Sequence, residues 1–210
     1  MSIRYYLIHC DEHEERMSHI TKLKEEFNQE ITIFKGISTN HVPLSEQVNY
    51  IQQTKPIIKL TNFRFWQSGQ IGCYLSHIGL MEHIMQNKES DYSVIFEDDV
   101  VFDTTTLHST IEKIIEHNLD FDILYLGNNN ENKGNHLVDN IYHVDNNNHC
   151  WGLHALIIHN KNIEKILNVN YTIIHALDVQ YHLLNCTKKL TNLVVHPVIC
   201  GHANLKSNIC

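Results

Sequence analysis

Three consecutive carboxylates, Glu97, Asp98 and Asp99, directly follow an apolar run at Val94-Ile95-Phe96. Burying such charges without a partner costs several kcal/mol, so they must reach solvent, pair with cations or bind a metal ion. In an extended chain Glu97 and Asp99 point to one face and Asp98 to the other. The Glu-x-Asp spacing can therefore place two hard oxygen ligands around one divalent ion, and a solvated turn is the alternative that the spacing leaves open.

A divalent ion at this place suits the departure of a diphosphate. Mg²⁺ or Mn²⁺ neutralises the charge that develops on a phosphate oxygen when the bond between sugar and diphosphate breaks. In open α/β sheets the ligand crevice lies at the carboxyl ends of strands, where the triplet falls. A metal-dependent phosphohydrolase would use the same carboxylates on water, but it would leave the neighbouring Ser76-His77 pair unexplained.

The elements expected around the triplet alternate between strand and helix. Apolar runs predict strands over 3–10, 31–34, 92–102, 121–126, 137–144, 151–159 and 190–197, the sixth following a polar, Asn-rich segment. Helical spacing predicts helices over 12–28, 69–87, 104–118, 160–168 and 175–185, with Thr104 or Thr106 capping the third. Residues 38–65 read as a loop region with room for a short helix, and a tail follows the last strand. This alternation predicts an α/β fold.

Composition narrows the class of protein. A chain of 210 residues with 42% hydrophobic and 19% charged residues predicts one globular domain over 1–210. A net charge of −8 argues against a nucleic-acid partner. No run approaches the roughly 20 apolar residues of a membrane span, and the first residues lead straight into a strand without a signal peptide, so we expect a cytoplasmic protein. The six cysteines lack the close spacing of a zinc knuckle and are expected to be reduced.

Two motifs taken together resemble the signature of glycosyltransferase family 25, which includes lipooligosaccharide galactosyltransferases and collagen hydroxylysine galactosyltransferases. They are Gly69-Gln70-Ile71-Gly72-Cys73-Tyr74-Leu75-Ser76-His77 and Ser93-Val94-Ile95-Phe96-Glu97-Asp98-Asp99-Val100. Weaker matches are Arg4 to Ile8 with Arg16, Phe121 to Gly127, and Ala176-Leu177-Asp178. The resemblance implies a GT-A fold, a Rossmann-like mixed sheet flanked by helices. It also implies a nucleotide-sugar donor that is UDP-linked, a divalent metal, and inversion at the anomeric carbon.

The resemblance also implies roles for individual residues. Glu97 and Asp99 correspond to metal ligands, with His202, preferred over His196, as a third ligand from the C-terminal segment. The donor side comprises Leu7, Ile8, His9, Arg16, Ser76, His77 and Asp98, although Arg16 could be structural and His77 could only brace the site. Asp178 is the candidate base that takes the acceptor's proton, and a carboxylate at a helix N-terminus is its plain structural interpretation. Trp151 and His154 form the acceptor side, unless Trp151 is simply core.

The expected reaction is transfer of galactose or glucose from a UDP-sugar, with Mn²⁺ or Mg²⁺, to the hydroxyl of a glycan, a lipid-linked glycan or a hydroxylated protein. One segment departs from the family pattern: His9-Cys10-Asp11-Glu12-His13 stands where an Asn and basic residues usually follow the first strand. A catalytically silent nucleotide-sugar-binding module is therefore an alternative. The intact Glu97, Asp99 and Asp178 argue against it.

Overall fold

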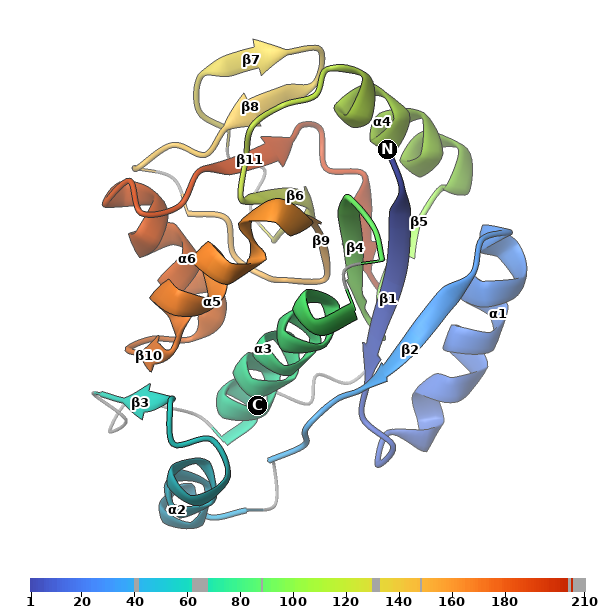
Figure 1. Ribbon diagram of the computed structural model, residues 1–210. Helices are drawn as coiled ribbons and strands as arrows, with labels where there is room; N and C mark the ends of the chain where they lie inside the picture. Colours follow the sequence, from blue (N-terminus) through green and yellow to red (C-terminus); the bar gives the residue numbers. More distant parts are fainter. Residues whose placement is uncertain are drawn as a thin grey trace.

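A mixed sheet of eight strands runs through the protein in the order β2-β1-β4-β9-β6-β11-β8-β7 (Figure 1). The computed structural model describes residues 1–39, 42–61, 68–87, 89–129, 133–147, 149–203 and 205. The strands of this sheet are β1 (Ile3–His9), β2 (Ile31–Lys35), β4 (Tyr92–Glu97), β6 (Ile123–Gly127), β7 (His136–Val138), β8 (Ile141–His143), β9 (Ala155–His159) and β11 (Asn192–Val195). Two further pairs, β3 (Lys59–Leu60) with β10 (Thr172–Ile173) and β5 (Val100–Phe102) with β12 (Cys200–His202), lie outside it.

Strand direction decides which segments meet at the acidic triplet. β1 runs parallel to both β2 and β4, so these three strands end at the same edge of the sheet. β9 runs antiparallel to β4, and the backbone N–H of Glu97 donates to the carbonyl of His154 at 3.1 Å. The residues that precede β9 therefore lie beside the carboxyl end of β4.

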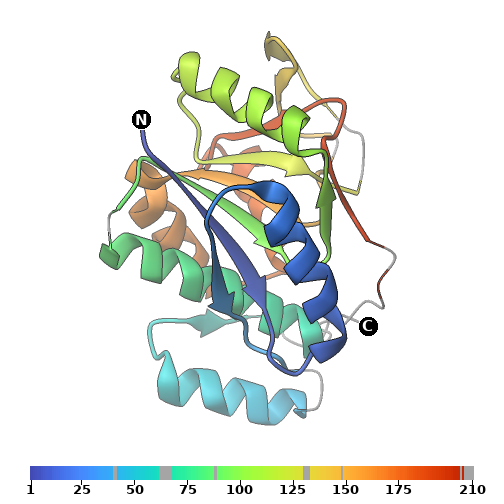
Figure 2. The same ribbon diagram turned by 90° about the vertical axis from the view of Figure 1, so that its right-hand side faces the viewer.

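Helices cover both faces of the sheet (Figures 1 and 2). They are α1 (Met17–Phe27), α2 (Leu44–Thr54), α3 (Ser68–Asn87), α4 (Thr104–Glu116), α5 (Ile163–Asn170) and α6 (Leu177–Cys186), with short 3₁₀ turns η1 (Glu14–Arg16) and η3 (Asn160–Asn162). Side chains of β1 alternate between two buried clusters, as the pleat of a strand requires. Tyr5 and Leu7 pack with α1 and α4, whereas Tyr6 and Ile8 pack with α3, α5 and α6. This three-layer α/β architecture confirms the predicted fold class.

The segment predicted as one strand over 92–102 is two strands. β4 ends at Glu97, Asp98 and Asp99 form the turn, and β5 begins at Val100. β5 then pairs antiparallel with β12, which places His202 opposite Val100. The segment over 190–197 is therefore not the last strand, because part of the tail predicted after it pairs as β12 and returns to the acidic triplet.

Two other local predictions need correction, and the short helix allowed for in 38–65 is present. The residue that caps α4 is Asp103, and not Thr104 or Thr106 as predicted. The Oδ1 of Asp103 accepts from the N–H of Thr106 at 2.8 Å. The region 38–65 contains the eleven-residue α2 and the strand β3, and its last residues, including Phe65, lie outside the described part. The strand predicted over 137–144 is the hairpin β7–β8, which turns at Asp139 with φ 47°.

Two further observations concern membrane-spanning helices and the state of the cysteines. Among the described residues, no helix combines the length and apolarity needed to cross a bilayer. The five described cysteines, Cys10, Cys73, Cys150, Cys186 and Cys200, are free thiols.

Candidate active site

Two adjoining cavities open where β1 and β4 end, and Cys73, Glu97 and Asp99 line both of them. The first holds about 110 Å³, and its other walls include Ile8, Cys10, His13, Arg16, Ser76 and His77. The second holds about 350 Å³, and its other walls include Gln70, Asn129, Gly152, His154, Asp178 and His202. The carboxylates of Glu97 and Asp99 therefore lie at the junction of the two cavities. The guanidinium of Arg16 is on the first side, and the carboxylate of Asp178 is on the second.

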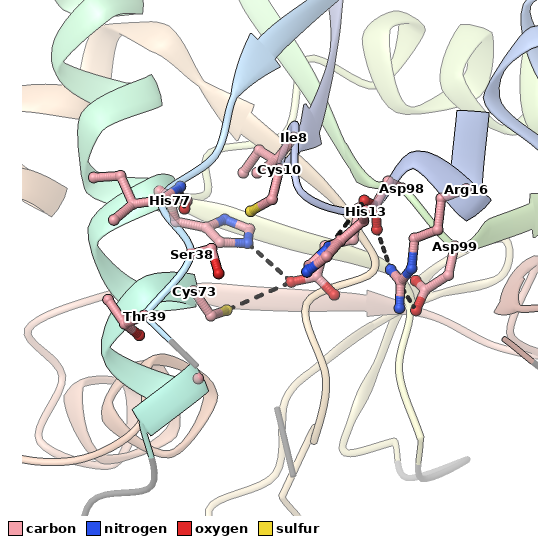
Figure 3. A pocket seen from close by; sticks show the side chains of 14 residues that line it. Ile8, Cys10, His13, Arg16, Ser38, Thr39, Cys73, His77, Asp98 and Asp99 are labelled. Carbon is pink, nitrogen blue, oxygen red and sulfur yellow. Dashed lines mark hydrogen bonds and ion pairs between the residues drawn. The ribbon is translucent and has the colours of Figure 1, made fainter. Parts of the chain in front are cut away.

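Asp98 anchors a buried network in the wall of the first cavity, and Figure 3 shows its contact with Arg16. Its side chain is 8% exposed; Oδ1 accepts from Nη1 of Arg16, and Oδ2 lies 2.8 Å from Nδ1 of His9. Both carboxylate oxygens are thus occupied inside the protein. The same Arg16 Nη1 lies 3.4 Å from Oδ2 of Asp99. Asp98 and His9 consequently fix the guanidinium of Arg16 at the cavity wall, and charge-assisted hydrogen bonds make that position rigid.

Glu97 is held by two side chains of α3 that lie one helical turn apart. Nε2 of His77 lies 3.1 Å from Oε1 of Glu97, and the thiol of Cys73 donates to the same oxygen at 3.6 Å. Figure 3 draws both interactions as dashed lines from the labelled His77 and Cys73. Burial raises the pKa of Glu97, but the hydrogen bond and charge of His77 outweigh it, so the pKa lies below its ordinary value. Burial, followed by the charge of Glu97, raises the pKa of the Cys73 thiol. Glu97 is therefore a carboxylate and Cys73 a neutral thiol at neutral pH.

Asp99, like Glu97, is partly exposed, with a side chain that is 21% exposed against 23% for Glu97. Burial and then the charge of Glu97 raise its pKa, which means that a cation would relieve the crowding of negative charge. His202 borders the second cavity beside Asp99, because the backbone N–H of Ala203 donates to the carbonyl of Asp99 at 2.6 Å. In the described part of the chain, one group of three potential ligands has donor atoms within 4.8 Å of one another, and it is Cys73, His77 and Glu97. Glu97, Asp99 and His202 would need side-chain rotation to share an ion.

Asp178 faces the second cavity from the first turn of α6. Its Oδ2 accepts from the N–H of Gly152 at 3.2 Å, and its Oδ1 accepts from the N–H of Val179 at 2.8 Å. Each oxygen keeps a further lone pair. His154 lines the same cavity with Nε2 3.2 Å from the carbonyl of Cys200, and burial lowers its pKa, so the imidazole is neutral at neutral pH.

Some predicted site residues lie elsewhere. Leu7 is fully buried in the core cluster against α1 and α4, and His9 is connected to the site through its contact with Asp98. Trp151 stacks on His149 with ring centroids 4.7 Å apart, and from this segment Gly152, Leu153 and His154, not Trp151, line the second cavity. Ser76 lines the first cavity, but its hydroxyl is used within the protein. Its Oγ accepts from the N–H of Ile37 and donates to the carbonyl of Gly72, both at 2.7 Å, and so braces the cavity wall.

Cys10 and His13 line the first cavity and were not predicted as site residues. They belong to the segment that departs from the family pattern, in the turn between β1 and η1. Ser38 and Thr39 were also missed, because they follow β2 in a region without a periodic pattern. For His13, the signal available in the sequence was its spacing of four residues from His9, which was predicted as a site residue.

The fold is of the GT-A type, as comparison with solved structures indicates. Protein A197 from STIV matches with a TM-score of 0.52 and 14% identity, covering 99% of this chain and 87% of that chain. Residues 1–349 of TarS from S. aureus, solved in complex with UDP-GlcNAc, match with a TM-score of 0.51 and 10% identity, covering 100% of this chain and 60% of that chain. At these identities the likeness concerns the fold alone.

The family model for glycosyltransferase family 25 (LPS biosynthesis protein) matches residues 2–181. The chain therefore belongs to glycosyltransferase family 25, as the two motifs predicted, and is a glycosyltransferase. A comparison with curated protein sequences finds no match. The matched region contains the acidic triplet, Ser76-His77 and Asp178, whereas His202 lies beyond it.

Proposed function

We propose that this protein transfers a hexose, galactose or glucose, from a UDP-sugar to an acceptor hydroxyl with inversion, in a reaction that depends on Mn²⁺ or Mg²⁺. The observation that carries the proposal is the pair of cavities that meet at Glu97 and Asp99. A donor on the Arg16 side and an acceptor on the Asp178 side would then meet at the carboxylates. Residues 1–210 would act as one catalytic domain.

The donor would enter from the first cavity. Its 110 Å³ is well below the roughly 300–1,000 Å³ of most ligand sites, so a UDP-sugar must extend beyond it toward the second cavity. Arg16 and His13 would face the diphosphate, and Ile8 would contact the nucleoside. TarS, a structural neighbour, was solved with UDP-GlcNAc, which supports a UDP-linked donor.

The residues at the junction suit a divalent cation. Two carboxylates with an imidazole are ligands that Mn²⁺ accepts in proteins, and the crowded charge of Glu97 and Asp99 favours a cation. Glu97, Asp99 and His202 would hold the ion. Bound there, it would neutralise the negative charge that develops on the departing diphosphate.

Asp178 would act as the base. It faces the larger cavity, where Asn129 and His154 are available to position an acceptor, and its carboxylate oxygens retain lone pairs for the proton of the attacking hydroxyl. Hydrogen bonds from Gly152 and Val179 fix its orientation. Attack from the Asp178 side, opposite the leaving diphosphate, inverts the anomeric carbon. A glycan, a lipid-linked glycan or a hydroxylated protein would supply the hydroxyl.

The test is release of UDP from UDP-galactose and UDP-glucose with Mn²⁺, measured with and without a panel of free sugars and glycosides. We expect release that depends on acceptor, and a decrease of about 10²–10⁴-fold in Asp178→Asn with the donor Kd unchanged. An Asp145→Asn variant, altered outside both cavities, is the matched control and keeps full activity. Equal UDP release without any acceptor would indicate hydrolysis, and donor binding without release would indicate a silent module; either result contradicts the proposal.

A further inference from the structure

α3 presents two side chains of types that can ligate metal ions, Cys73 and His77, toward the end of β4. Cys73 and His77 are four residues apart, so they occupy the same face of the helix on successive turns. Both contact Oε1 of Glu97, the thiol at 3.6 Å and Nε2 of the imidazole at 3.1 Å. His77 is 1% exposed, and its ring is therefore held in place by the core.

The separations of these atoms match a tetrahedral zinc site. Ligands bound at 2.0–2.3 Å around a tetrahedral ion lie roughly 3.5–3.6 Å apart for sulfur and oxygen, and roughly 3.3–3.4 Å apart for nitrogen and oxygen. The observed sulfur–oxygen separation of 3.6 Å falls in this range, and the observed nitrogen–oxygen separation of 3.1 Å is slightly shorter than its range. All three donor atoms lie within 4.8 Å of one another. Small side-chain rotations would thus suffice to bind an ion.

The chemistry of the donors selects the ion. A thiolate with an imidazole and a carboxylate is a set that Zn²⁺ binds well, whereas Mg²⁺ and Mn²⁺ prefer oxygen ligands. We propose that Cys73, His77 and Glu97 bind Zn²⁺, with the fourth coordination position open toward the junction of the two cavities. Binding releases the thiol proton of Cys73 to solvent and forms the bond between sulfur and zinc.

This zinc site shares Glu97 with the ion of the proposed transfer reaction. Asp99 and His202 would hold the ion of the transfer reaction and do not belong to the zinc site. Cys73 and His77 belong to the zinc site alone. Zn²⁺ would therefore withdraw Glu97 from the donor site and inhibit donor binding. That consequence rests on the proposed function, whereas the binding of Zn²⁺ does not.

Titration with Co²⁺, a spectroscopic substitute for Zn²⁺, tests the site without any substrate. We expect one equivalent of Co²⁺ to produce the near-ultraviolet charge-transfer band of a thiolate ligand, and Zn²⁺ to displace it. Cys73→Ser should abolish the band and weaken Zn²⁺ binding at least about tenfold, since even indirect partners of a metal cost that much. Circular dichroism and thermal unfolding confirm that each variant is folded.

Two variants are matched controls. Cys10→Ser removes the other thiol of the first cavity and should keep the band, and Asp99→Asn should keep it while losing metal-dependent donor binding. Absence of the band in the folded wild-type protein, its persistence in Cys73→Ser, or its loss in Cys10→Ser would overturn the assignment. In those cases Cys73 and His77 only orient Glu97 through hydrogen bonds. A band with no donor binding under any condition would support the zinc site and contradict the proposed transfer.

Discussion

Asp98→Asn isolates the contribution of the buried charge network, because asparagine keeps the shape of the side chain and removes its charge. Arg16 is 5% exposed and would lose the main counter-charge beside it. Breaking a buried ion pair by removing one partner costs about 3–5 kcal/mol. We expect the lower end, because Nη1 of Arg16 keeps Oδ2 of Asp99 at 3.4 Å.

A loss of about 3 kcal/mol corresponds to a decrease in Tm of roughly 6–12 °C for a chain of this size. Differential scanning calorimetry in EDTA measures it, so that no metal contributes. Asp11→Asn is the matched control: its partner Lys35 and Asp11 itself are both exposed, and surface pairs contribute little. The double variant Arg16→Gln with Asp98→Asn should lose less than the sum of the single losses, because the two residues share one interaction. A Tm for Asp98→Asn equal to that of Asp11→Asn would refute the view that Asp98 holds Arg16.

Two further predictions concern the walls of the first cavity and the junction. In Gly72→Ala the new Cβ would lie 2.4 Å from the carbonyl oxygen of Ile37, so we expect the free energy of unfolding to fall by about 1–3 kcal/mol and donor binding to weaken. Gly79→Ala on the same helix is the control: its new Cβ would have Phe34 as nearest neighbour at 3.6 Å, and the free energy of unfolding should rise by about 0.5–1 kcal/mol. Urea unfolding measures both. The raised pKa of Asp99 means that the folded protein holds this proton more tightly than the unfolded chain does, and the corresponding stability is lost as pH rises through the folded-state pKa. Asp99→Asn should therefore have a higher Tm than wild type in EDTA at neutral pH, and the difference should vanish below the ordinary pKa of aspartate; a lower Tm at neutral pH would contradict this.

The strands and helices that carry strong periodic patterns were predictable. The spacing of Ile71, Leu75 and Ile78 marks the buried face of α3, and the apolar run before Glu97 marks a strand buried on both faces. The pairing of β5 with β12 was not predictable, because each strand has three residues and their contact spans about a hundred positions of sequence. Such short strands are stabilised by tertiary context and leave no local period.

The site shows the same division between local and long-range information. Residue types at Glu97 to Asp99 indicated a cation and the end of a strand, and Asp98 was expected on the opposite face from its neighbours. The sequence did not indicate that Asp98 uses both its oxygens on Arg16 and His9, because ion pairs across more than eighty residues depend on the fold. Likewise, Leu7 points into the core because the pleat of β1 assigns alternate residues to opposite faces.

The most direct test of the central claim is the thermal unfolding of the protein with UDP, in Mn²⁺ and in EDTA, for wild type and Asp99→Ala. At 100 times its Kd, a ligand of the folded state adds about 2.7 kcal/mol, or roughly 5–10 °C in Tm. The account predicts such a shift with UDP and Mn²⁺, none in EDTA, and none in Asp99→Ala. A shift of equal size in Asp99→Ala, or no shift with UDP and Mn²⁺ in the wild type, would contradict a metal-dependent UDP-sugar site at the junction of the two cavities.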